Sequence, residues 1–219
     1  MKKKIGGILV GVVFVGVILF FVYQNSEPRQ KIDYAANLDR TAVTVDGVTL
    51  SLRNMAFYIA YEEGKVEKQA IAYNPEDTGQ YWNAHTNGVF VKKVSQRAAL
   101  DMAVHDEILS KLAKKENIEL GKAEKKAVQE KTEEFWNGLL DEQQKRICVN
   151  EKEIGTTVEK IALAEKYQSV LAQREGGTEK DYAFEGKAYE TLREEHSVKV
   201  NKHVWNLLDF GNVTITHAK

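Results

Sequence analysis

Histidines are the first side chains to consider for chemistry, because imidazole acts both as a base and as a metal ligand. The chain holds five: His85, His105, His196, His203 and His217. None lies in a metal-binding spacing such as His-Glu-x-x-His, and the chain lacks Gly-x-Ser-x-Gly, a phosphate-binding loop and Gly-x-Gly-x-x-Gly. The sequence therefore predicts no catalytic residue, no metal ligand and no cofactor, and it favours a protein that is not an enzyme.

Cysteine and charge content narrow the class of protein further. The single cysteine, Cys148, cannot form an intramolecular disulfide, and its apolar neighbours favour a small buried hydrophobe over a reactive thiol. Lys and Arg total 31 against 32 Asp and Glu, giving a net charge of −1. This balance provides no concentrated basic surface, so nucleic acid is not an expected partner, and no small-molecule substrate is indicated.

Aromatic side chains are the remaining candidates for a binding role. Seven of them lie on the first predicted helix of the domain or in the irregular region after it: Phe57, Tyr58, Tyr61, Tyr73, Tyr81, Trp82 and Phe90. Such side chains can form a peptide-binding surface, or they can supply ordinary core area. Tyr73, Tyr81 and Trp82 are the preferred candidates, because they lie between turn signals and not on a periodic face.

The N-terminus has the pattern of a membrane signal anchor. Lys2, Lys3 and Lys4 precede the uncharged residues 5–23, which would reach roughly 28 Å as a helix. Bulky residues at the end of this run favour a retained anchor over a cleaved signal peptide, although cleavage stays open. We expect residues 1–23 to be a single transmembrane helix, with a cytoplasmic N-terminus and an extracytoplasmic C-terminal domain at the cell membrane. Residues 24–40 are interpreted as a juxtamembrane linker.

The elements that must position these side chains follow from turn signals and periodicity. Asp46-Gly47 between β-branched runs predicts a hairpin over residues 42–50, and Ser51 then begins a helix. Residues 64–88 are predicted to be broken by turns. Further helices are predicted at 89–117, 122–146, 150–173 and 179–195, followed by an extended piece at 198–200 and a last turn after Asn201.

The hairpin sequence Ala42-Val43-Thr44-Val45-Asp46-Gly47-Val48-Thr49-Leu50-Ser51 resembles the opening of SurA/PrsA-type extracytoplasmic chaperones. The order of predicted elements over residues 42–173 is similar as well, so 41–174 are expected to form a SurA N-terminal-like domain. Residues 178–219 resemble the segment that returns to the chaperone lobe, and the chain after Arg174 is too short to hold the family's parvulin isomerase domain as well. The implied fold class is mainly α: an N-terminal transmembrane helix followed by a SurA N-domain-like helical lobe with a short β-hairpin.

Two functional hypotheses follow. The resemblance implies a membrane-anchored chaperone-like protein that binds unfolded or partly folded exported polypeptides and has no isomerase activity. The alternative is a bitopic envelope scaffold or assembly protein that docks one dedicated partner. The third and least favoured hypothesis is a peptidyl-prolyl isomerase. An open, concave apolar groove favours the first hypothesis and a flat patch favours the second.

Overall fold

A tight β-hairpin lies at the centre of the fold in the computed structural model, which describes residues 30–217. Strands β1 (Thr41–Val45) and β2 (Val48–Ser51) pair antiparallel, and the turn residues Asp46 and Gly47 have φ angles of 47° and 84°. Positive φ at both positions is the geometry of a type I′ turn, which Asp-Gly sequences favour. The predicted hairpin is confirmed.

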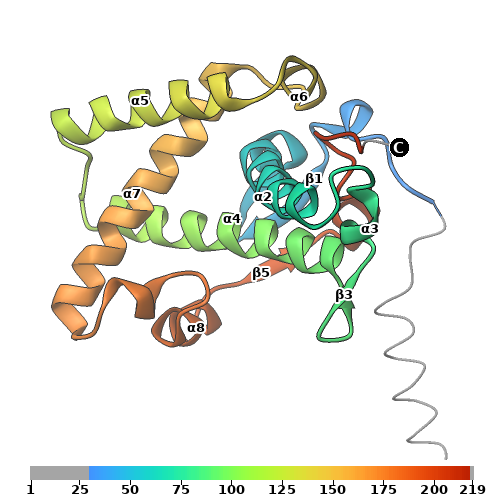
Figure 1. Cartoon of the computed structure of the whole chain (residues 1–219). Helices are drawn as coiled ribbons and strands as arrows, with labels where there is room; N and C mark the ends of the chain where they lie inside the picture. Colours follow the sequence, from blue (N-terminus) through green and yellow to red (C-terminus); the bar gives the residue numbers. More distant parts are fainter. Residues whose placement is uncertain (1–29, 218–219) are drawn as a thin grey trace, which may run out of the picture.

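A third strand extends this hairpin into a sheet. β5 (Val198–Val200) pairs antiparallel with the other edge of β1, giving the order β2-β1-β5. The Asp46 carboxylate fixes the approach of β5, because it accepts hydrogen bonds from Ser197 N at 2.8 Å and His196 Nδ1 at 2.7 Å. The C-terminal part of the chain therefore completes a sheet that the N-terminal part begins (Figure 1).

Helices form most of the fold, and three predicted helical ranges differ from the observed ones. One of them is 179–195, where residues 183–186 separate a short 3-10 helix from an α-helix. Within residues 30–217, the four long helices are α2 (Leu52–Tyr73), α4 (Val91–Lys115), α5 (Lys122–Gly138) and α7 (Glu151–Glu175), and the short α6 (Asp141–Arg146) lies between the last two. The helix predicted to break at Gly64 continues to Tyr73, because Val66 and Ala70 extend its buried face. The helix predicted over 122–146 is interrupted at Leu139 and Leu140, which separate α5 from α6.

Short elements connect these helices. They are η1 (Ala35–Asn37), α3 (Gly79–Trp82), β3 (His85–Thr86), β4 (Val89–Phe90), η2 (Glu179–Tyr182), α8 (Lys187–Glu194) and α9 (Lys202–Trp205). β3 and β4 form a separate two-stranded hairpin before α4. The region predicted as broken, 64–88, therefore contains the end of α2 together with α3 and β3.

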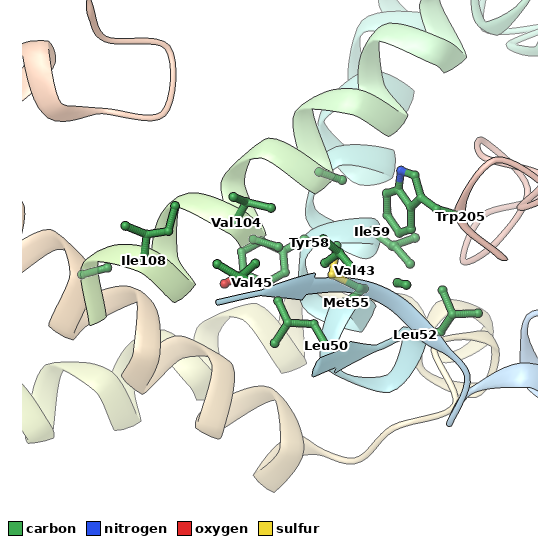
Figure 2. Packing of buried hydrophobic residues seen from close by; sticks show 14 of the residues in the cluster. Val43, Val45, Leu50, Leu52, Met55, Tyr58, Ile59, Val104, Ile108 and Trp205 are labelled. Carbon is green, nitrogen blue, oxygen red and sulfur yellow. The ribbon is translucent and has the colours of Figure 1, made fainter. Parts of the chain in front are cut away.

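The main core lies where the hairpin meets α2 and α4 (Figure 2). Val43 and Val45 of β1 are fully buried and face Met55 and Ile59 of α2, while Trp205 of α9 closes one side. Each large apolar side chain buried in this way contributes about 1.5–3 kcal/mol to folding. The core thus joins residues from both ends of the described chain.

Helix α5 is attached to the rest of the fold mainly through α7, which also packs on α4 (Figure 1). A second, smaller core supports this attachment and consists of Ala56, Ala60, Ile147, Val149, Ile154 and Val158. Phe135, Trp136 and Leu139 of the α5 end pack against it. Helices α2 and α5 therefore meet at this smaller core, which contains Ala56 and Ala60 of α2.

Residues 31–40, predicted as linker, instead pack on the folded chain. Ile32 N donates to Leu207 O at 2.9 Å, and the Lys31 ammonium lies 3.0 Å from Asp209 Oδ1. Tyr34 is buried and its hydroxyl donates to Ile147 O at 3.1 Å. The linker interpretation is wrong for these residues because Tyr34 fills a core position.

A buried glutamate holds the C-terminal segment against α2. The Glu63 carboxylate, fully inaccessible to solvent, accepts hydrogen bonds from the backbone N–H groups of Gly211, Val213 and Thr214 at 2.6, 3.0 and 2.6 Å. The Thr214 hydroxyl donates a fourth at 2.6 Å. Burial raises the pKa of Glu63, and the four donors act in the opposite direction by stabilising the carboxylate.

The predicted fold class needs correction. The expected transmembrane helix at 1–23 lies outside the described residues, as does the linker up to residue 29. Within residues 30–217, no helix is both long enough and apolar enough to cross a membrane. The described fold is mainly helical, with a three-stranded sheet in place of the hairpin alone and a second small hairpin.

Candidate functional site

A cleft of about 1030 Å³ lies between α2, α4, α5 and α7, and we call it the α2–α5 cleft. Small-molecule pockets usually measure about 300–1,000 Å³, so this volume is at the upper limit of that range and also suits a polypeptide segment. Its lining is mainly apolar and aromatic, and these side chains are Phe57, Tyr58, Tyr61, Ile71, Met102, Phe135, Leu139, Leu140, Val158, Ile161 and Phe184.

An aromatic cluster joins the two main walls of the cleft. The Phe57 ring of α2 lies 4.5 Å from the Phe135 ring of α5, measured between centroids. Tyr61 stacks on Phe57 one helical turn further along α2, at 6.0 Å. Tyr61 is 47% exposed, in contrast to the buried Tyr58. The cleft therefore presents an accessible aromatic face that a rigid helix holds in place.

The floor of the cleft contains a buried polar network. Tyr58 donates its hydroxyl hydrogen to Asp106 Oδ2 at 3.0 Å, and His105 Nδ1 lies 2.8 Å from Asp106 Oδ1. His105 Nε2 lies 2.9 Å from the Tyr182 carbonyl oxygen. Both ring nitrogens of His105 thus lie within hydrogen-bond distance of an oxygen. Burial, together with the Asp106 carboxylate, raises the pKa of Tyr58. These groups satisfy one another and fix α4 to η2.

Charged side chains also belong to the lining of the cleft. Lys65 pairs with Glu62 on α2, and Lys131 of α5 lies 3.5 Å from Glu165 of α7. Lys68 and Glu134 also line the cleft, from α2 and α5 respectively. A polar rim around an apolar centre is the usual composition of a protein-binding surface.

Three of the seven predicted binding residues line the cleft, three lie elsewhere near the surface, and the seventh, Trp82, is buried. Phe57, Tyr58 and Tyr61 line the α2–α5 cleft. Tyr73 and Tyr81 instead contact each other away from it, with ring centroids 5.6 Å apart, and Phe90 packs on His85 at 4.0 Å. The structure therefore brings together the aromatic residues on the periodic face of α2, and not those between the turn signals.

Trp82, one of the preferred candidates, is a core residue. Its side chain is 2% exposed, and its indole Nε1–H donates to Glu67 Oε2 at 2.6 Å. A Cβ placed on Gly211 would lie 2.8 Å from Trp82 Cε3, which shows how closely the C-terminal segment covers the ring. The peptide-binding prediction for Trp82 is corrected accordingly, because an occupant cannot reach it.

Several cleft residues were missed by sequence reasoning. Ile71 was hidden because α2 was expected to end at Gly64, so its register with Phe57 and Tyr61 was not considered. Phe135 and Leu139 lie in the range 122–146 that was predicted to be a helix, and helical periodicity alone does not separate a core face from a cleft wall. Phe184 lies within the range 179–195 that was predicted to be one helix, but it falls between η2 and α8, so only the tertiary fold reveals its place at the cleft.

Metal and thiol chemistry have little support among residues 30–217. No group of three or more His, Cys, Asp and Glu side chains there could hold a metal ion. Cys148 is half-buried, with a φ of 56°, and burial raises the pKa of its thiol. A raised pKa lowers the thiolate fraction at neutral pH, which is the reactive form.

Comparison of the chain with protein-family models, curated proteins and solved structures found no match. The resemblance to SurA/PrsA-type chaperones therefore remains a hypothesis that rests on the residues quoted for it.

Proposed function

We propose that this chain is a polypeptide-binding module that holds apolar segments of unfolded or partly folded proteins in the α2–α5 cleft. One observation carries the proposal: aromatic and aliphatic side chains line facing walls of a concave space of about 1030 Å³. Such a surface shields apolar segments from water and from one another, which is the physical basis of aggregation suppression.

The exposed members of the lining support this proposal most directly. Tyr61, Ile71 and Leu140 are 47%, 51% and 71% exposed, although each has a large apolar surface. Exposure of several such residues in one concave region is typical of an interaction site. The concave shape favours varied polypeptide segments over one flat dedicated partner, so the scaffold hypothesis ranks second.

Aggregation suppression tests the proposal. Residues 31–219 contain all the contacts described above, and we expect them at stoichiometric amounts to slow the light-scattering increase of an unfolded test protein. The double variant Tyr61→Ser and Leu140→Ser should weaken binding of the unfolded protein about tenfold or more, since exposed aromatic anchors dominate such surfaces.

Tyr73→Ser is the matched control. Tyr73 lies on the same helix, is 65% exposed and is outside the cleft, so its loss removes a comparable side chain without altering the site. Equal effects of the Tyr61→Ser and Tyr73→Ser variants would contradict the assignment to the cleft. No suppression by the unaltered chain, together with one stable co-purifying partner, would favour the scaffold hypothesis instead.

A further inference from the structure

One face of α2 forms a straight wall of the α2–α5 cleft. Phe57, Tyr61, Gly64, Lys68 and Ile71 all line the cleft and follow one another at steps of four and three residues. This spacing places them on one side of a helix, over about 21 Å of its length. The wall therefore has the length of a four-turn helix lying alongside it.

Gly64 lies in the middle of this wall, and nothing in the described fold accounts for its lack of a side chain. A Cβ placed on Gly64 would meet no atom within 4 Å, and its φ is not positive. A glycine inside a helix weakens that helix relative to alanine. Its presence here is therefore explained neither by packing within residues 30–217 nor by backbone geometry.

Gly155 of α7 shows what an interior helical glycine does elsewhere in this molecule. A Cβ on Gly155 would lie 3.4 Å from Thr132 Cγ2, because α5 packs across α7 at that point. Small residues let two helices approach closely where they cross. Gly64 differs from Gly155, because it lies at the cleft and no second helix of the described chain packs over it.

The secondary structure of the lining also restricts the backbone conformation that a polypeptide segment bound in the cleft can have. The lining residues of α2, α4 and α7 lie inside continuous helices, whose backbone groups are already paired, and among residues 30–217 no strand residue lines the cleft. An extended segment would therefore leave its own N–H and C=O groups without backbone partners, which is costly in an apolar site. A helical segment satisfies these groups internally.

Charged side chains on the two walls favour one orientation of a helix bound between them. Lys68 is on the α2 wall and Glu134 on the α5 wall, both are exposed, and within residues 30–217 neither makes an ion pair. Side chains of opposite charge on the occupant would complement them: an acidic one facing α2 and a basic one facing α5.

We propose that the cleft binds an amphipathic helix of a partly folded polypeptide, which packs its apolar face on Phe57, Tyr61 and Ile71 and crosses α2 at Gly64. This proposal rests on the proposed function and narrows its ligand from any apolar segment to a helix-forming one. The mode of recognition is a helix in a groove, with anchors at positions i, i+3, i+4 and i+7.

Peptides of identical composition test the ligand class. Three peptides of about 15 residues, which corresponds to four helical turns, contain the same Leu, Ala, Glu and Lys residues in different orders. The first has helical apolar periodicity, the second alternates apolar and polar residues, and the third is scrambled. Calorimetry with the full chain should show the first binding about tenfold more tightly than the others. Circular dichroism of the mixture should show added helix.

Substitutions at Gly64 test the crossing point. Gly64→Leu fills the space over α2 and should weaken binding of the first peptide about tenfold or more. Tyr73→Leu places the same side chain at an exposed position on the opposite side of α2, outside the cleft, and should leave binding unchanged. Thermal unfolding of both variants establishes that they remain folded.

The outcomes separate this inference from the proposed function. Equal binding of all three peptides, with no effect of Gly64→Leu, overturns the helical ligand but leaves the polypeptide-binding function standing. Absence of binding by every peptide and by the unfolded test protein overturns both. Preference for the alternating peptide overturns the helical ligand in favour of an extended one.

Discussion

Two carboxylates make the contacts that join residues far apart in this sequence. Glu63 of α2 accepts four hydrogen bonds from the segment 211–214, and Asp46 in the β1–β2 turn accepts two from the residues that precede β5. Hydrogen bonds to an ionised acceptor are the stronger ones, because the charge adds to the attraction. These two side chains therefore specify where the C-terminal part of the chain packs.

The Asp46→Asn variant tests the contribution of the Asp46 charge to stability. Asparagine also favours the left-handed turn conformation, so the hairpin is retained while the charged contacts to His196 and Lys111 are lost. We expect a loss of about 1 kcal/mol in the free energy of unfolding near neutral pH. Chemical denaturation measures it.

The pH dependence of that difference has a defined sign. The hydrogen bond from His196 is the main factor that holds the pKa of Asp46 below its ordinary value of 3.8. A lowered folded-state pKa means that the stabilisation is fully present above pH 3.8 and is lost as the pH falls through the folded-state pKa. The advantage of the unaltered chain over Asp46→Asn should therefore shrink under acid conditions. A difference that stays constant down to about pH 2 would contradict this role.

Local signals at the residue scale identify the turn but not its partner. Asp46-Gly47 predicts the hairpin because both residues tolerate positive φ. Nothing local connects Asp46 with His196, which lies 150 positions later in the sequence. Likewise, no local pattern in the sequence distinguishes Glu63 from the acidic residues of the surface, although it is fully buried in the fold and bonded to Thr214.

Interior glycines differ in what they do for the elements that contain them. Gly64→Ala should raise the free energy of unfolding by about 0.5–1 kcal/mol, because α2 gains helix propensity and the new methyl group meets no neighbour. Gly211→Ala should lower it, since φ at this residue is +94° and the methyl group would press on Trp82. Thermal unfolding of the two variants gives both signs. A stabilised Gly211→Ala variant or a destabilised Gly64→Ala variant would contradict the roles assigned to the two glycines.

Helix positions were predictable because apolar periodicity marks them, but helix ends and cleft walls were not. The periodic face of α4 placed that helix within two residues of both ends. α2 was predicted too short because Gly64 and the turn signals near Pro75 were interpreted together as one broken region. For the candidate site, the same apolar pattern describes a buried residue such as Tyr58 and an exposed one such as Tyr61. Only packing distinguishes them.

Completion of the main core and of the three-stranded sheet depends on the C-terminal residues. Val204, Trp205, Leu208 and Phe210 are buried in the main core, and β5 supplies the third strand. Sequence reasoning predicted an extended piece at 198–200, but its pairing with β1 depends on long-range packing that no local pattern encodes.

A chain shortened after Glu195 tests this dependence. It retains every long helix but loses β5, α9 and the segment that Glu63 binds. We expect it to keep helical circular dichroism, to lose cooperative thermal unfolding and to bind a hydrophobic dye. The milder Trp205→Ala variant should remain folded at a cost of about 3–5 kcal/mol.

Adding residues 196–219 as a separate peptide provides the control, because it should restore part of the cooperative transition. A shortened chain that melts as cooperatively as the intact one would show that the C-terminal core residues are dispensable.

The contact between Glu63 and Thr214 joins residues that are synthesised far apart in time, because 151 positions separate them in the sequence. A ribosome releases the chain N-terminus first, so α2 and the hairpin emerge long before their partners near residue 200 exist. Until then Trp82 lacks the cover that the segment around Gly211 gives it in the folded chain. A protein proposed to shelter unfolded segments would itself pass through an extended period as one.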